Sequence, residues 1–356
     1  MLKTLLYDNH SLLGAKIAPF GGWLMPIQYQ GILAEHLHTR VAVSVFDICH
    51  MGEFLLEADA VASGLDRIVT QNIVSMPHGS CRYGFMLNDQ AGVIDDLVVY
   101  RINKNNWMLV VNAATIDNDF AHIKKNLKGE LKLENISDKT GKLDVQGPQS
   151  LEVLQKIFGQ SVAELKYYTF AKFNFLNQEC IISRTGYTGE RGYEIYVSSD
   201  YVVKLWEVLL QDTRVKPAGL GARDTLRLEM GYPLYGQDLD TKHSPLAAGL
   251  IKFVDLNKDF IGKEALLNEQ KSGLNEQLIC FQTDSRRAAR HGFTIFNNNK
   301  PVGVVTSGSF SPSLAVGIGM GYVCAKYEVG AQLITKDLIH EIAVRVVKKP
   351  FVIVKK

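Results

Sequence analysis

Apolar residues recur three or four positions apart in several segments of the first 270 residues, a spacing that predicts amphipathic helices. The first such segment spans residues 32–42. Its apolar positions are Ile32, Leu33, Leu37 and Val41, and its polar positions are Glu35, His36 and Arg40. Further helices are expected from Asp59, Thr115, Pro148, Asp200 and Arg223, where capping residues, a proline or glycines precede an apolar period.

Shorter segments alternate or concentrate apolar residues and are bounded by turn residues, which predicts β-strands. Strands are expected over 81–87, 93–102, 107–111, 169–176, 180–184 and 193–197. From about residue 275 short apolar runs alternate with turns to the end of the chain, which is typical of a small β-barrel or sandwich. The polar and flexible segment Glu269–Gly273 marks the expected boundary, so residues 1–275 and 276–356 are predicted to form separate regions of an α+β protein.

The composition is that of an ordinary globular protein, with 46% hydrophobic and 21% charged residues. The length of 356 residues suggests two or three domains, and the net charge of +2 gives no general attraction to nucleic acid or membranes. No apolar run approaches the roughly 20 residues that span a bilayer. Five scattered cysteines and the lack of a leader segment favour reduced thiols and a cytoplasmic location.

The sequence does not contain the common motifs for metals, phosphates or hydrolytic nucleophiles. His36 and His38 are two residues apart, so on a helix they cannot chelate one ion together. The segment Gly317-Ile-Gly-Met-Gly321 has the wrong spacing for a dinucleotide fingerprint, and there is no Gly-x-Ser-x-Gly elbow. We therefore expect no metal, no flavin and no nicotinamide.

Two adjacent aspartates, Asp95 and Asp96, interrupt the predicted strand 93–102. Because side chains on a strand alternate between faces, one aspartate must point toward the interior with its apolar neighbours. Ionised carboxylates are seldom buried without a partner, so an aspartate there is the first candidate for a reacting group. The alternative is that one aspartate is solvated and the other caps a turn or pairs with an arginine.

A third carboxylate, Glu194, follows the glycine-rich segment that begins at Arg184. The glycines predict a tight loop between two strands, and Glu194 opens the second strand at the edge of a core. Such a carboxylate can accept two parallel hydrogen bonds from the amidine-like edge of a pterin or guanine ring. The alternative is a salt bridge to Arg184.

Arg223 and Arg227 lie four residues apart on one face of a predicted helix that follows Gly219 and Gly221. Two arginines beside a glycine-rich helix start suit the recognition of a carboxylate. The alternative is ion pairing along the helix, for instance between Asp224 and Arg227, which stabilises a protein little.

One set of motifs runs in order from about residue 5 to residue 352. The motifs are Leu6-Tyr7-Asp8, Phe20-Gly21-Gly22-Trp23, Phe46-Asp47-Ile48-Cys49-His50-Met51-Gly52, Gly92-Val-Ile-Asp-Asp-Leu97, Val111-Asn112-Ala113, Gln146-Gly147-Pro148, Arg184-Thr-Gly-Tyr-Thr-Gly-Glu190, Gly221-Ala-Arg-Asp-Thr-Leu226, Phe260-Ile-Gly-Lys-Glu-Ala265 and Thr306-Ser-Gly-Ser-Phe-Ser-Pro312. Each motif is weak alone, but together they resemble the glycine cleavage T-protein family of tetrahydrofolate-dependent aminomethyltransferases. One departure is Cys49, where the family usually has serine.

The resemblance implies three domains in a cloverleaf around a central folate channel, the first two divided near residues 140–150 and the last a small C-terminal β-barrel. It also implies the reaction. The aminomethyl group on the lipoyl arm of a partner H-protein gives its methylene carbon to tetrahydrofolate, and ammonia and 5,10-methylenetetrahydrofolate are released. The folate is expected to be polyglutamylated, and neither nucleic acid nor a membrane is an implied partner.

The resemblance also implies roles for single residues. Asp96 matches the essential carboxylate near N5 and N10 of folate, Glu194 the pterin-binding glutamate, and Arg223 an arginine that helps to hold folate. The matching pocket positions are Asn112, Tyr83, Met51, Tyr100 and Tyr187, and core packing is the alternative for Met51 and the tyrosines. Arg290 matches a channel arginine that could meet a folate or partner carboxylate, with a solvated surface charge as its alternative.

Other functions share such a folate site. The folate half of a sarcosine or dimethylglycine demethylase needs a flavin domain, which this sequence does not show. A non-enzymatic folate-binding protein that supports iron–sulfur cluster assembly carries a Lys-x-Cys-x-x-Gly signature, whereas Arg223–Glu229 contains no cysteine. A degenerate pocket that only scaffolds a partner is disfavoured because Asp96, Glu194 and Arg223 are all retained.

Overall fold

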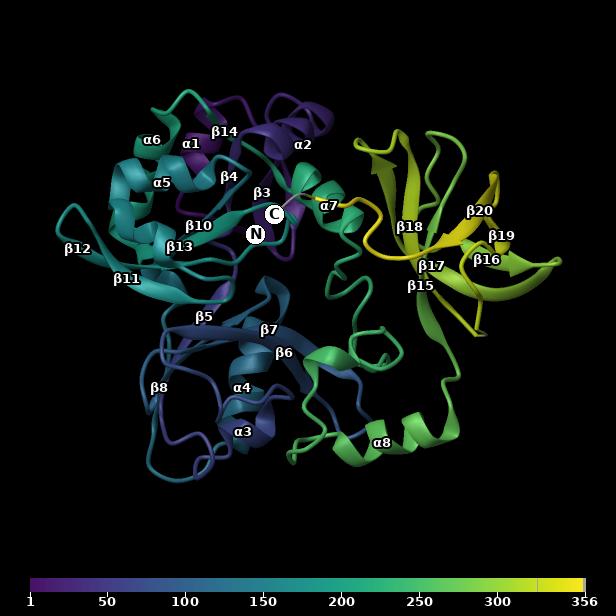
Figure 1. The fold of residues 1–356 in the computed structure, drawn as a ribbon, viewed down its shortest axis with the longest axis horizontal. Helices are drawn as coiled ribbons and strands as arrows, with labels where there is room; N and C mark the ends of the chain where they lie inside the picture. Colours follow the sequence, from purple (N-terminus) through teal and green to yellow (C-terminus); the bar gives the residue numbers. More distant parts are fainter. Residues whose placement is uncertain (325, 355–356) are drawn as a thin grey trace. The chain divides into compact units, whose positions relative to one another are not determined.

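A computed structural model describes residues 1–324 and 326–354 and divides into two compact units (Figure 1). Unit 1 comprises residues 1–84 and 97–224 with Val354, and unit 2 comprises residues 85–96 and 225–353. The border between the units cuts through three elements, which are β6 (Ser80–Leu87), β7 (Val93–Arg101) and α7 (Leu220–Glu229). The division into three domains stays a prediction.

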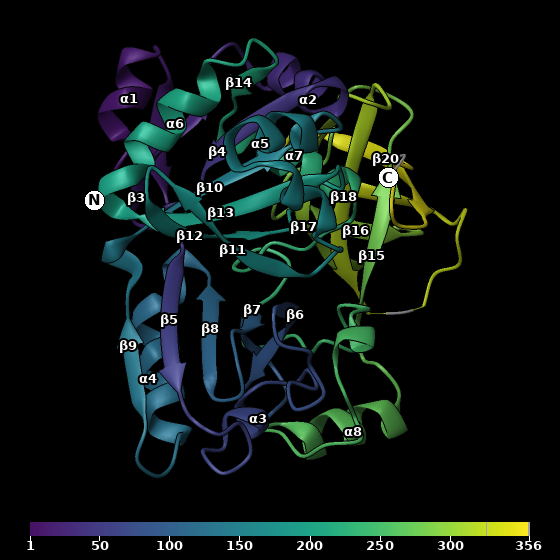
Figure 2. The same ribbon diagram turned by 60° about the vertical axis from the view of Figure 1, so that its left-hand side comes forward.

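The largest sheet of unit 1 has the strand order β11-β12-β13-β10-β4-β14. Its strands are β4 (Val43–Asp47), β10 (Thr140–Gln146), β11 (Phe170–Phe175), β12 (Gln178–Ser183), β13 (Gly192–Ser198) and β14 (Val215–Pro217). Helices α5 (Ser150–Phe158) and α6 (Val202–Leu210) pack on one face of it (Figure 2). Leu143 and Val145 of β10 lie in that apolar core together with Leu154 and Trp206 of the helices.

Strand β10 is buried along its whole length, so both faces of the sheet are covered there. Because side chains alternate along a strand, Lys142, Asp144 and Gln146 point away from the face that carries Leu143 and Val145. This second face is therefore buried and polar.

A five-stranded sheet has the order β6-β7-β8-β5-β9, with β5 (Gly52–Glu57), β8 (Asn106–Val111) and β9 (Lys132–Asn135). Helix α4 (Ile116–Asn126) packs on β5 through an edge-to-face contact between Phe120 and Phe54. Near the N-terminus a small sheet joins β1 (Leu2–Lys3), β2 (Lys16–Phe20) and β3 (Trp23–Gln28), beside helices α1 (Tyr7–Leu12) and α2 (Ile32–Val41), whereas helix α3 (Leu65–Ile68) contacts α4. Short 3-10 helices are η1 (Ala113–Thr115), η2 (Ser137–Lys139), η3 (Gln160–Glu164), η4 (Ser199–Tyr201) and η5 (Ile251–Phe253).

Unit 2 contains a closed barrel with the strand order β15-β18-β17-β16-β19-β20 (Figure 1). Its strands are β15 (Gln277–Gln282), β16 (Thr294–Asn297), β17 (Lys300–Ser311), β18 (Val316–Val323), β19 (Gln332–Lys336) and β20 (Glu341–Val347), and helix α8 (Lys263–Ser272) precedes them. The predicted α+β fold with a C-terminal β-barrel is thus confirmed. The glycines of Gly317–Gly321 have a packing role, since a Cβ at Gly321 would lie 2.6 Å from the Val304 carbonyl oxygen.

Helix α2 forms where expected, but its buried side is the polar one. Glu35, His36 and Thr39 are buried, whereas Leu33 and Leu37 are exposed. The reason is a set of hydrogen bonds, because the Glu35 carboxylate accepts backbone N–H groups of Tyr29, Gln30, Gly31 and Gly219 at 2.6–3.1 Å.

Three smaller expectations are corrected. Asp59 does not begin a long helix. Its carboxylate accepts the N–H groups of Val61 and Ala62 in a turn, and the left-handed Gly64 delays the helix until Leu65. Pro148 lies in a turn two residues before α5. Residues 269–272 form the last turn of α8 and are not a flexible linker.

Candidate functional site

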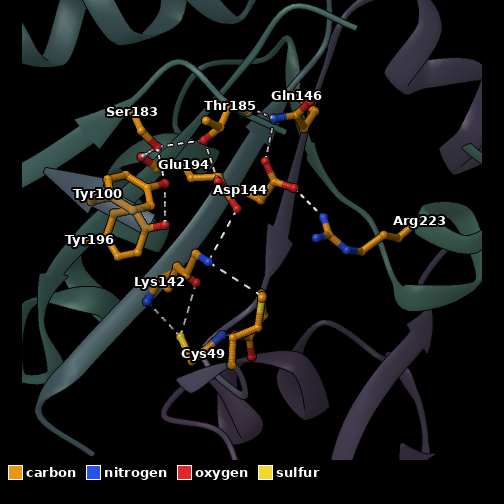
Figure 3. Close-up of polar contacts among 12 residues, drawn as sticks. Cys49, Tyr100, Lys142, Asp144, Gln146, Ser183, Thr185, Glu194, Tyr196 and Arg223 are labelled. Carbon is orange, nitrogen blue, oxygen red and sulfur yellow. Dashed lines mark hydrogen bonds and ion pairs between the residues drawn. The ribbon is translucent and has the colours of Figure 1, made fainter. Parts of the chain in front are cut away.

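Four charged side chains meet on the polar face of the large sheet in unit 1 (Figure 3). Lys142 and Asp144 come from β10, Glu194 comes from β13, and Arg223 comes from α7. Asp144 stands directly opposite Glu194 in the strand register, and Lys142 stands opposite Tyr196. We call Lys142, Asp144, Glu194 and Arg223 the charge cluster.

Glu194 is held by two protein groups. The Lys142 ammonium lies 3.4 Å from its Oε1, and the Thr185 hydroxyl donates a hydrogen bond to its Oε2. Burial raises the pKa of the Glu194 carboxyl, but the charge of Lys142, the Thr185 hydrogen bond and the charge of Arg223 outweigh it, so the pKa is below its usual value. Glu194 is therefore a buried carboxylate that stays ionised. Arg184, the partner considered from sequence, donates instead to the carbonyl of Leu165.

Arg223 pairs with Asp144, whose carboxylate also accepts a hydrogen bond from Gln146. The guanidinium carbon of Arg223 lies 5.1 Å from the centroid of the Tyr187 ring. Burial and the neighbouring Glu194 raise the pKa of Asp144 to about 6, against the lowering effect of Arg223. Arg227 turns elsewhere and forms a buried ion pair with Asp238 in unit 2.

Aromatic and sulfur groups surround the ammonium of Lys142. The Tyr196 ring centroid lies 4.9 Å from Nζ, and the Met51 sulfur lies 3.6 Å from it. The hydroxyl of Tyr100 bonds to that of Tyr196 at 2.8 Å and to Ser183 at 3.1 Å. The structure thus joins five residues expected from the sequence into one network, namely Met51, Tyr100, Tyr187, Glu194 and Arg223.

Further titratable groups lie near the charge cluster. Burial raises the pKa of Glu53 to about 8, although Lys142 opposes this, and its Oε1 has no hydrogen-bond partner among the described residues. Burial lowers the pKa of His50 to about 4. Cys49, the departure from the family pattern, has a thiol whose pKa is raised by burial, and its sulfur contacts the backbone N–H and carbonyl of Lys142. Cys49 is thus a packing contact beneath the cluster.

The two adjacent aspartates of β7 separate as alternation requires. Asp95 is fully buried and lies on the same face of the strand as Val93 and Leu97. Asp96 is half-buried and lies on the opposite face, with Ile94 and Val98. Burial alone therefore favours Asp95 as the reacting group, whereas the family resemblance favours Asp96. Asp96 belongs to unit 2 and the charge cluster to unit 1.

Three other residues are expected at the site from the sequence, namely Tyr83, Asn112 and Arg290. Tyr83 and Asn112 are half-buried in unit 1, and Asn112 precedes the short helix η1. Arg290 in unit 2 is exposed and donates to the carbonyl of Gly308 at 3.1 Å. Among residues 1–324 and 326–354 no three His, Cys, Asp or Glu side chains gather in a way that could hold a metal ion. No helix in the described part of the chain is long and apolar enough to cross a membrane.

Sequence reasoning missed Lys142 and Asp144. The signal was present as Lys-Leu-Asp-Val-Gln, residues 142–146, in which polar and apolar residues alternate before the Gln146-Gly147-Pro148 motif. Such alternation ordinarily indicates a strand with one solvated face. Only the structure shows that the polar face is buried.

Comparisons with known proteins agree over nearly the whole chain. The model of the GCVT N-terminal domain matches residues 6–258, and that of the glycine cleavage T-protein C-terminal barrel domain matches residues 276–352. A relative from Halothermothrix orenii, named aminomethyltransferase, is 43% identical over 357 residues, with 99% of this chain and 100% of the relative covered. A second one, from Thermotoga maritima, is 41% identical, with 99% and 98% covered.

A solved structure is also similar. The crystal structure of glycine cleavage system aminomethyltransferase T from Bartonella henselae superimposes with a TM-score of 0.92 at 35% identity, covering 98% of both chains. Since the two domain models cover most of the sequence and the relatives span its full length, the chain belongs to the glycine cleavage T-protein family.

Proposed function

We propose that the protein is the aminomethyltransferase of a glycine cleavage system. It transfers the methylene carbon from the aminomethyl-dihydrolipoyl arm of an H-protein to tetrahydrofolate and releases ammonia and 5,10-methylenetetrahydrofolate. The observation that links this function to a site is the buried, ionised Glu194 beside Arg223 and a network of tyrosines. The relatives that match the full length of the chain are named aminomethyltransferases. Those relatives favour this function over the demethylase and iron–sulfur alternatives.

The residues of the charge cluster fit a reduced pterin. A pterin presents a ring N–H and an amino group side by side, and an ionised carboxylate can accept both. Each oxygen of Glu194 contacts one protein group, and a carboxylate has about four acceptor positions, so capacity for two more hydrogen bonds remains. In this proposal Glu194 fixes the pterin edge, and Arg223 with Tyr187 contacts the folate from another side.

Tetrahydrofolate supplies N5 and N10, the two amines that take the methylene carbon. The proposed task of Asp96 is to orient the attacking amine, to accept its proton and to stabilise positive charge near the reacting carbon. Positioning and charge stabilisation of this kind commonly supply much of the rate in enzymes. The half-buried position of Asp96 on β7 is compatible with such a role, because a carboxylate there is sheltered and still reachable.

The finer assignments are part of the same proposal. Asn112, Tyr83, Met51 and Tyr100 would line the pocket, and Arg290 would meet a carboxylate of a polyglutamylated folate or of the lipoylated H-protein. No metal, flavin or nicotinamide is required. The five free cysteines agree with a reducing, cytoplasmic location.

The test is a turnover assay with purified components. The protein is mixed with aminomethylated H-protein and tetrahydrofolate, and ammonia and labelled methylene carbon on folate are measured. We expect both products at equal rates, and neither without the H-protein. Ammonia release of the same rate without folate, or label that stays on the H-protein, would overturn the proposed function.

A further inference from the structure

Two members of the charge cluster have no role in the proposed binding of folate. The side chain of Lys142 is 1% exposed and that of Asp144 is 0% exposed. A buried charge costs considerable free energy unless it is paired, and a buried ion pair is often no more stabilising than apolar residues of the same volume. Stability alone is therefore a weak reason for two opposite charges at this place in the core.

The positions of the two charges follow from the strand. Residues 142 and 144 are two apart on β10, so both side chains project from the face that carries Glu194. Lys142 contacts Glu194, and Asp144 contacts Arg223. Lys142 and Asp144 thus each contact a different one of the two residues proposed to hold the folate. The two positive and two negative charges of the cluster sum to zero.

We propose that Lys142 and Asp144 are positioning residues of the pterin site, acting as a matched pair of buried charges that fixes the orientation and ionisation of Glu194 and Arg223. Lys142 keeps Glu194 charged so that it accepts the pterin N–H groups. Asp144 holds the Arg223 guanidinium in place against Tyr187. This inference rests on the proposed function for the identity of the ligand.

The charge balance makes the proposal specific. Removal of Lys142 alone leaves Glu194, Asp144 and Arg223 with a net charge of −1, which favours uptake of a proton by a carboxyl group. Removal of the charge of Asp144 as well leaves only Glu194 and Arg223, and the balance returns. Other titratable groups that face the cluster are Glu53 of β5, His50, Cys49, Cys81 of β6, Tyr100 of β7 and Tyr196 of β13.

The experiment measures binding of 5-formyltetrahydrofolate, an air-stable reduced folate, by calorimetry between pH 6 and pH 8. For Lys142→Met we expect affinity that is weaker at pH 6 than at pH 8 by about twofold or more, because without its ammonium partner Glu194 is ionised in a smaller fraction of the protein at pH 6. Proton release on binding, measured in two buffers of different ionisation enthalpy, should rise at pH 6 because Glu194 must then lose a proton. Lys142→Arg should restore the profile of the unmodified protein.

Two further variants keep the result interpretable. The double variant Lys142→Met with Asp144→Asn is charge-balanced and should have a flatter pH profile than Lys142→Met, with weaker binding at every pH because Arg223 has lost its charged partner. Lys172→Met makes the same substitution at an exposed lysine on β11 of the same sheet and should bind like the unmodified protein. Thermal unfolding of each variant checks that it is folded.

The outcomes separate the two proposals. If the unmodified protein does not bind the probe, the proposed function fails. If it binds, and Lys142→Met binds equally well with a flat pH profile, the positioning role is overturned. Equal weakening of Lys142→Met at every pH, with no change in proton release, would reduce Lys142 to a structural residue and would also overturn it.

Discussion

The buried ion pair between Arg227 and Asp238 makes the removal of either charge costly. Arg227 and Asp238 form an ion pair with side chains that are 1% and 0% exposed, and Asp238 also accepts hydrogen bonds from the hydroxyls of Thr306 and Ser307. Without the guanidinium, the Asp238 carboxylate would stay buried without its counter-ion. The pair is therefore a sensitive point of unit 2.

Arg227→Met should lower the free energy of unfolding by about 3–5 kcal/mol, the usual cost of removing one partner of a buried ion pair. Urea unfolding followed by circular dichroism measures the loss. Lys172→Met is the matched control, because Lys172 and Glu179 form an exposed pair at 2.8 Å and such pairs contribute about 0–1 kcal/mol. Equal losses in the two variants would contradict the structure at Arg227.

Glu53 gives a prediction about pH. Burial raises its pKa from 4.5 to about 8 in the folded protein. A raised pKa means that the folded state binds the proton more tightly than the unfolded state, so this stabilising contribution is complete below pH 4.5 and is lost as the pH rises to about 8.

Glu53→Gln should therefore lose less stability between pH 5 and pH 8 than the unmodified protein, and at pH 8 it should be the more stable of the two. The difference in unfolding free energy between the two proteins is at most about 1.4 kcal/mol for each unit by which the pKa of Glu53 differs between the folded and unfolded states. Urea unfolding at the two pH values measures it. A steeper fall in the variant would show that Glu53 is ionised in the folded protein.

At the scale of the element, α2 shows what a hydrophobic pattern cannot decide. The period of 3.6 located the helix correctly, yet the structure buries Glu35 and exposes Leu37. The polar side is buried because four backbone N–H groups converge on the Glu35 carboxylate. Those groups come from the preceding turn and from Gly219, which a local pattern cannot foresee.

Glu35→Ala should destabilise the protein by about 2–4 kcal/mol, because it leaves buried N–H groups without an acceptor. Leu37→Gln on the same helix should change stability by only about 0.5 kcal/mol, since Leu37 is exposed. Both are measured by urea unfolding. A larger loss of stability in Leu37→Gln than in Glu35→Ala would show that the apolar side of α2 is the buried one.

The same limit explains how much of the fold and the site could be predicted from the sequence. Strands β7 and β8 were expected to within one residue, because turns bound their apolar runs. Strand β10 was missed, and it carries half of the charge cluster. Glu194 and Arg223 were found through motifs, whereas Lys142 and Asp144 depend on contacts between distant segments.

At the scale of the whole molecule, a ligand of the folded state must raise its stability. At a concentration 100 times its dissociation constant, a folate would add about 2.7 kcal/mol. We expect 5-formyltetrahydrofolate to raise the midpoint of thermal unfolding by several degrees in the unmodified protein, and NAD or FAD to leave it unchanged. Glu194→Gln should lose most of the rise. A rise with NAD or FAD alone would contradict the proposed ligand.

The most direct test of the central claim concerns Asp96, the carboxylate proposed to serve the reaction itself. Asp96→Asn keeps the size of the side chain and removes its charge, so 5-formyltetrahydrofolate should bind with nearly unchanged affinity. Ammonia release from aminomethylated H-protein at saturating tetrahydrofolate should fall by about 10²–10⁴-fold, the usual contribution of a positioned acid or base. Unchanged ammonia release in this variant would contradict the account.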